Sequence, residues 1–248
     1  MKRILEVCVG SVASAKAARE GGAARVELCS ALEVGGVTPS LGLIHKVRAI
    51  EGLKLHVLIR PRGGDFLYDE AEVACMEQDI ITARKSGVDG VVIGALTVDG
   101  DIDVSVCRRL VEAAGGMSIT FHRAFDMCRN PMQALEDVIK LGCHRILTSG
   151  QAGTACEGVV LLRELVEAAG DRIIIMPGCG VNADNASYIL DATGAEEIHA
   201  SARRSVESGM LYRHRGVSMG GNEDDEYARK ETHKEEVQRI VAAINQNE

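Results

Sequence analysis

The side chains best suited to chemistry stand at the ends of two apolar segments. Residues 57–59 are apolar and run into two arginines and an aspartate, and residues 119–121 run into a histidine, an arginine and an aspartate. A buried strand that ends this way places charge at one rim of a sheet, where a charge without a partner is costly. Such groups suit anion binding and proton transfer. The side chains concerned are Arg60, Arg62, Asp65, His122, Arg123 and Asp126.

Short apolar segments of strand length recur along the chain and alternate with stretches of helical periodicity. Asn130-Pro131, for example, has the form of a helix cap followed by proline at the first helical position. Eight alternations indicate a parallel sheet covered by helices, and predict a single (β/α)8 TIM barrel. A doubly wound open sheet is the alternative, but the turn after the first strand lacks G-x-G-x-x-G. The predicted strands are Ile4–Val9, Arg25–Cys29, Leu55–Arg60, Gly90–Gly94, Ser118–Arg123, Arg145–Ser149, Ile173–Pro177 and Glu197–Ala200.

No linker or break in composition divides the chain, so residues 1–248 are expected to form one domain. One irregularity follows the eighth strand, where Ala202 to about Asp224 is predicted to be a long loop. A loop of that length in a compact domain is usually a functional cover, or evidence against the assignment of elements. A C-terminal helix is predicted to begin near Glu226. Its expected buried face is Val237, Ile240, Val241 and Ile244.

Alternation along the strands predicts which side chains face the barrel axis. Outward positions pack on helices and are apolar, so polar positions of opposite parity face the axis or the mouth. The expected cluster lies at the carboxyl ends of the strands, where such barrels place their active sites. A structural ion network of Glu6, Glu27 and Arg60 is an equally simple explanation for those three. The inward set is Glu6, Cys8, Glu27, Cys29, Arg60, Arg62, His122 and His199, with Asp65 and Asp126 just beyond.

Glycine-rich turns follow the sixth and seventh strands. Backbone N–H groups at such a turn, next to a helix start that Asn182 is expected to cap, can form an anion pocket, which barrels often build after strands seven and eight. A tight turn that requires positive φ is the alternative. The anion-binding candidates are Arg62, Arg123, Ser149, Gly150, Gly178, Gly180 and Ser201.

Cys8 and Cys29 stand out among the eight cysteines because they are expected at equivalent positions of neighbouring strands, in the parallel phrases Glu-Val-Cys and Glu-Leu-Cys. Adjacent parallel strands lie about 4.8 Å apart. Two thiolates at that separation can share a soft ion such as Cu(I). A buried cysteine that only fills apolar space is the alternative.

Composition excludes several classes of partner. The formal charge of −8 and the absence of tryptophan argue against nucleic acid, which requires a basic face or an aromatic stacking surface. No run of apolar residues is long enough to span a membrane, and no signal peptide is evident. The cysteines are therefore expected to stay reduced in the cytoplasm.

Several long phrases of the sequence resemble the CutC copper-homeostasis family. They include residues 27–29, 35–40, 59–66, 120–127, 147–150 and 216–219, so the resemblance covers essentially the whole chain. It implies a cytoplasmic (β/α)8 barrel, often oligomeric, that is associated with copper tolerance and binds Cu(I). In that family the ligands would fall on Cys8 and Cys29. Cys179 and His214 depart from the family pattern, and either could add a ligand.

Two functional hypotheses follow. The first is a Cu(I)-binding homeostasis protein, expected to be a homodimer or homotetramer, with copper held by Cys8 and Cys29. Copper capture gives no reason for arginines and aspartates at the same mouth. The second hypothesis is therefore an enzyme that acts on a small anionic metabolite, phosphorylated or carboxylated. Its catalytic groups would come from Glu6, Glu27, Arg60, Asp65, His122, Asp126 and His199. A purely structural protein is a distant third.

Overall fold

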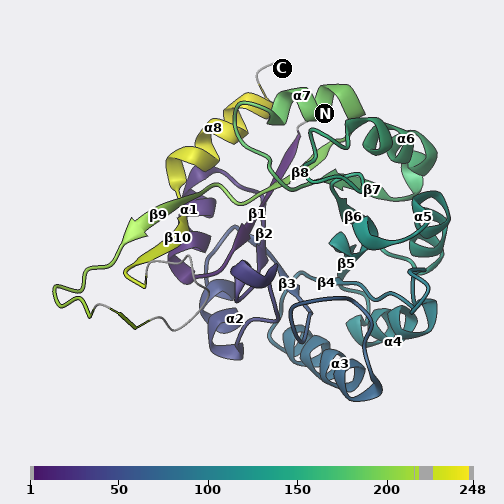
Figure 1. Cartoon of the computed structure of the whole chain (residues 1–248), viewed down its shortest axis with the longest axis horizontal. Helices are drawn as coiled ribbons and strands as arrows, with labels where there is room; N and C mark the ends of the chain where they lie inside the picture. The colour runs from purple at the N-terminus through teal and green to yellow at the C-terminus, as the bar shows by residue number, and fades with distance from the viewer. Residues whose placement is uncertain (1–2, 215, 218–225, 246–248) are drawn as a thin grey trace.

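A nearly closed barrel of eight parallel strands forms the centre of the molecule. The computed structural model describes residues 3–214, 216–217 and 226–245. The strands are hydrogen-bonded in the order β7-β6-β5-β4-β3-β2-β1-β8, and β7 lies in contact with β8. Figure 1 shows the helices arranged around the outside of this barrel. The strands are β1 Ile4–Val9, β2 Arg25–Leu28, β3 Lys54–Leu58, β4 Gly90–Ile93, β5 Ser118–Phe121, β6 Arg145–Thr148, β7 Ile174–Pro177 and β8 Glu197–Ala200.

The predicted (β/α)8 fold is confirmed, and each predicted strand agrees with the observed one to within two residues at either end. The sequence signals act as expected at α5, where the Asn130 side chain accepts a hydrogen bond from the backbone N–H of Gln133 and Pro131 opens the helix. The helices are α1 Val12–Gly21, α2 Leu41–Arg48, α3 Glu70–Lys85, α4 Val104–Ala114, α5 Pro131–Lys140, α6 Val159–Ala169, α7 Ala186–Thr193 and α8 Lys234–Ile244, with short 3-10 turns η1 Leu32–Val34, η2 Arg123–Met127 and η3 Gly170–Arg172.

The hydrophobic core lies between strands and helices, as the alternation predicts. Val7, Val26 and Val57 face outward from neighbouring strands and are fully buried. They pack in one cluster with helix residues such as Ile80 and Leu135. The alternate residues of each strand therefore face the barrel axis, and several of them are polar.

The segment after β8 differs from the predicted loop. It contains β9, Arg203–Glu207, paired antiparallel with β10, Ala228–Thr232, and Figure 1 shows this ribbon projecting beside α1. Residues 215 and 218–225, which belong to the predicted loop, lie outside the described residues.

The C-terminal helix begins at Lys234, not near Glu226. The residues just before it are held in β10 instead, because the backbone N–H of Thr232 donates to Ser14 in α1 and the Glu231 carboxylate accepts from the Ser11 hydroxyl. Of the predicted helix face, Val237, Ile240 and Ile244 are buried and Val241 is half-buried. Within the described ranges, no helix is long and apolar enough to cross a membrane.

Candidate functional site at the barrel mouth

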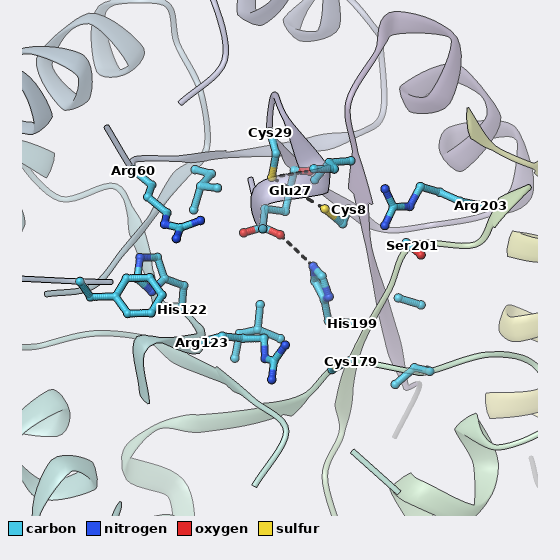
Figure 2. A pocket seen from close by; sticks show the side chains of 17 residues that line it. Cys8, Glu27, Cys29, Arg60, His122, Arg123, Cys179, His199, Ser201 and Arg203 are labelled. Atoms are coloured by element: carbon cyan, nitrogen blue, oxygen red, sulfur yellow. Dashed lines mark hydrogen bonds and ion pairs between the residues drawn. The ribbon is translucent and has the colours of Figure 1, made fainter. Parts of the chain in front are cut away.

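A cavity of about 230 Å³ opens where the carboxyl ends of the strands converge (Figure 2). That is more than ten times the roughly 15 Å³ that one water molecule needs. The structure brings together half of the predicted site residues in its wall and leaves the other half outside it. The predicted residues that line it are Cys8, Glu27, Cys29, Arg60, His122, Arg123, His199 and Ser201.

The two cysteines of this wall form a close pair. The strand register places Cys8 opposite Glu27, and the backbone N–H of Cys29 donates to Val9 beyond the end of the β1–β2 ladder. The expectation that the two cysteines hold equivalent positions is therefore wrong, because Cys29 lies two residues beyond Glu27, the residue that pairs with Cys8. Their sulfur atoms nevertheless lie 3.7 Å apart. Leu58 and Val92 pack against the pair and shield it from solvent.

Neighbouring groups shift the pKa values of the two thiols and of His199 in different directions. A hydrogen bond from Cys29 lowers the pKa of the Cys8 thiol, and the same bond, with burial, raises the pKa of Cys29 well above its ordinary value. Cys8 is thus the better thiolate. Burial opposes the charging of His199, but interactions with Cys8 and Glu27 hold its pKa well above the ordinary value. His199 Nε2 lies 2.9 Å from a Glu27 carboxylate oxygen, and this contact favours the charged form of the ring.

His122 has the opposite character. Burial, with the charge of Arg60 nearby, lowers its pKa to about 3, so the ring is neutral near pH 7. Its Nδ1 accepts a hydrogen bond from the backbone N–H of Ala124, which assigns the ring proton to Nε2. That Nε2 has no partner among the described residues. His122 is therefore a hydrogen-bond donor at the cavity wall.

Arg60 lies beside His122 and braces two loops. Its guanidinium donates to the backbone carbonyls of Val34, Gly36 and Gly64 at 2.7–2.9 Å. The predicted ion network of Arg60 with Glu6 and Glu27 is not formed.

A different ion network fills the barrel below the cavity. Arg25 donates to both Glu6 and Glu197, and Arg145 lies 2.7 Å from Glu197. The prediction that Glu6 stands at the rim is wrong, because Glu6 lies in the middle of β1, fully buried, where it pairs with Arg25 across to β2. The network is structural and holds two carboxylates against two guanidinium groups.

The predicted anion pocket after β6 is already filled by the protein itself. The Asp126 carboxylate accepts from the backbone N–H groups of Ser149 and Gln151, and it pairs with Arg123. The N–H of Gly150 donates to the side chain of Thr148. Asp126, Ser149 and Gly150 therefore stabilise this turn and do not line the cavity.

The remaining predicted residues lie beside the cavity. Arg62, on the loop before α3, pairs with Asp65 of the same loop and with Glu72 in the first turn of α3. The Gly178 N–H donates to the Thr148 carbonyl, and Gly180 belongs to a turn that does not start a helix.

The helix after that turn is α7, which begins only at Ala186. Asn182 is therefore not the cap of this helix. The side-chain oxygen of Asn182 accepts a hydrogen bond from the backbone N–H of Asp184 within the preceding turn.

Sequence reasoning missed two notable wall residues, Arg203 and Phe66. Arg203 follows His199 and Ser201 at alternate positions, so the same parity rule, continued two residues further, would have found it. Phe66 packs its ring 5.0 Å from that of His122, and only the tertiary fold brings it there. Cys179 lines the cavity, but its thiol donates to the Gly153 carbonyl and it is not part of the thiol pair. His214 lies outside the wall.

Three candidate metal ligands, two thiols and one carboxylate, lie together in the cavity wall. The candidate metal-binding atoms of Cys8, Glu27 and Cys29 all lie within 4.8 Å of one another, and all three residues are buried. Two soft sulfur ligands with one carboxylate match the preferences of a soft ion more than those of Mg²⁺ or Ca²⁺.

Comparison with known proteins agrees with this architecture. A protein of Chromobacterium violaceum named as a family protein CutC is 52% identical over 245 residues, which cover 99% of each chain. A mouse protein named copper homeostasis protein cutC homolog is 48% identical over 230 residues, 92% of this chain and 85% of its own. The solved structure of a putative copper homeostasis protein CutC from Streptococcus agalactiae superposes with a TM-score of 0.77 at 35% identity, over 80% of this chain and 98% of that one.

The family model for the CutC family matches residues 3–204, which contain all eight barrel strands and the cavity wall described above. A thiamine phosphate pyrophosphorylase from Pyrococcus furiosus shares the fold alone, with a TM-score of 0.60 at 16% identity over 99% of this chain and 96% of that one. On the match through the barrel and the extent of identity to its relatives, this chain belongs to the CutC family.

Proposed function

We propose that this protein serves copper homeostasis by binding Cu(I) at the thiol pair of Cys8 and Cys29. The observation that carries the proposal is the 3.7 Å separation of the two sulfur atoms in a buried pocket. A metal–thiolate bond is about 2.3 Å long, so one ion can contact both sulfurs. Cu(I) prefers thiolates, and the names of the mouse and Streptococcus relatives refer to copper homeostasis.

The surrounding groups support a role in taking up and releasing the ion. The lowered pKa of Cys8 favours the thiolate form that binds a metal, whereas Cys29, whose pKa is raised, must lose its proton when the ion binds. The Glu27 carboxylate lies close enough to contact the same ion. His199, held as a cation, is a counter-charge and not a ligand. Copper is the cargo in this proposal.

An anaerobic Cu(I) titration against a chromophoric competing chelator tests the site. We expect the wild type to bind one tightly held Cu(I) per chain and the Cys8→Ser, Cys29→Ser double variant to lose it. The matched control is Cys75→Ser, Cys156→Ser, which removes two thiols that are exposed or half-buried and lie outside the cavity wall. Equal stoichiometry and affinity in the wild type and the Cys8, Cys29 variant would refute the proposal.

Glu27→Gln provides a graded second readout. Loss of a group that orients or supplements metal ligands typically costs about 10–100-fold in affinity. We expect a loss in that range, with the stoichiometry kept. Unchanged affinity would remove Glu27 from the site while leaving the thiol pair in place.

We also propose that the chain is one domain, that it acts in the cytoplasm and that it forms a dimer or tetramer. All eight cysteines are free, which supports a reducing compartment. Light scattering after size exclusion tests the oligomeric state directly, and a monomer at micromolar concentration would contradict it.

A further inference from the structure

The cavity contains buried donors that copper does not use. Arg60 is only 5% exposed and His122 only 4%, yet Arg60 Nε and His122 Nε2 have no hydrogen-bond partner among the described residues. Buried polar groups are nearly always paired, so two orphan donors in one wall need an explanation. Both are N–H donors, which Cu(I) cannot satisfy.

The charge at this wall is also incomplete. The Arg60 guanidinium donates to three backbone carbonyls, lies 4.9 Å from the centre of the Phe66 ring and is close to the Tyr68 hydroxyl, and within the described part of the chain it makes no ion pair. A buried guanidinium without a counter-ion is costly. An anionic ligand would supply both the acceptor and the missing negative charge.

A second arginine faces the same space. Figure 2 shows Arg60 and His122 on one side of the cavity and Arg203 on the opposite side. Arg203 lines the cavity, and its side chain has no hydrogen bond or ion pair with any residue that the structure describes. Arg123 also lines the cavity but is already paired with Asp126, so Arg60 and Arg203 are the wall guanidinium groups that lack a carboxylate partner among the described residues.

We propose that the cavity also binds a small oxyanion, a molecule bearing a carboxylate or phosphate group, against the Arg60–His122 wall, with Arg203 adding attraction from the far side. The cavity volume of about 230 Å³ leaves room for such a molecule beside a single metal ion. This inference goes beyond the proposed copper function and does not depend on it.

The test uses metal-free, full-length protein with a Cu(I) chelator present. Inorganic phosphate and malonate are titrated separately by calorimetry at constant ionic strength. We expect saturable binding of at least one of them. Binding of phosphate alone identifies a phosphate-bearing ligand, and binding of malonate alone identifies a carboxylate-bearing one.

His122→Asn is the decisive variant, because the asparagine side-chain oxygen can still accept from Ala124 while the Nε2–H donor is lost. We expect it to weaken anion binding at least about tenfold, as is typical for a hydrogen bond to a charged group. Arg203→Met, which sacrifices no described contact, is expected to weaken binding several-fold and more strongly at low salt. It carries the test if thermal unfolding shows that His122→Asn does not fold.

Two controls separate this inference from the copper site. Arg108→Met removes an exposed arginine on α4, and the Cys8→Ser, Cys29→Ser variant removes the thiol pair. Both are expected to bind the anion as the wild type does. The absence of saturable binding of either anion at tens of millimolar, or equal weakening in Arg203→Met and Arg108→Met, would overturn the inference.

Discussion

Replacing Arg25 with methionine tests whether the ion network below the cavity holds the barrel together. Arg25 joins Glu6 to Glu197, and Glu197 keeps Arg145 as a second partner. Removal of the guanidinium leaves the fully buried Glu6 carboxylate without its close ion-pair partner, with the His199 ring nitrogen 3.8 Å away as the remaining basic group that can be charged. Breaking a buried pair on one side costs about 3–5 kcal/mol. For a chain of this size, each kcal/mol lowers the unfolding temperature by about 2–4 °C. We therefore expect a fall of about 6–20 °C.

The assay is thermal unfolding followed by circular dichroism, with urea unfolding to give the free energy. Arg48→Met is the matched control, because Arg48 pairs with Asp89 at a partly exposed site and such pairs contribute only about 0–1 kcal/mol. Adding Glu6→Gln to Arg25→Met removes the stranded charge and is expected to recover about 1–3 kcal/mol. If Arg25→Met were no more destabilising than Arg48→Met, the structural role given to Glu6 and Arg25 would be wrong.

Three further predictions concern stability. Burial lowers the pKa of His56 to about 3, so protonation favours the unfolded chain and stability falls as pH drops below about 6.5. In His56→Gln the slope of unfolding free energy against pH, measured with urea between pH 5 and 6, is expected to be smaller by about 1.4 kcal/mol per pH unit. An unchanged slope would show that His56 does not stay neutral. Asp126→Ala leaves backbone N–H groups of the turn after β6 unpaired. It is expected to lower the free energy of unfolding in urea by about 2–3 kcal/mol without changing the Cu(I) stoichiometry. A loss of copper binding would place Asp126 in the copper site. Gly36 has a φ of +88°, and a Cβ there would lie 2.8 Å from a Leu58 methyl group. Gly36→Ala is therefore expected to destabilise the protein by about 1–2 kcal/mol. An unfolding temperature of the variant equal to that of the wild type would contradict this.

The sequence alone predicted the barrel and several of its inward-facing side chains. Strand alternation has a period of two and is local, so Cys8, Glu27 and His199 could be assigned to the interior without coordinates. The pairing of Cys8 with Cys29 followed from the same rule, even though the assumed register was off. Thiols on adjacent strands stay within reach of each other despite a stagger of one residue pair, because neighbouring strands are so close.

Only the tertiary structure decided which charges neutralise each other. Arg25 and Glu197 are 172 residues apart in sequence, and their contact depends on how the staggered strands bring side chains to one level inside the barrel. Asp126 binds the turn after β6 and does not face the cavity, because backbone N–H groups of that turn lie within hydrogen-bond distance of its carboxylate. The sequence therefore determined which groups face inward, whereas the closure of the barrel determined which of them remain unpaired at the mouth.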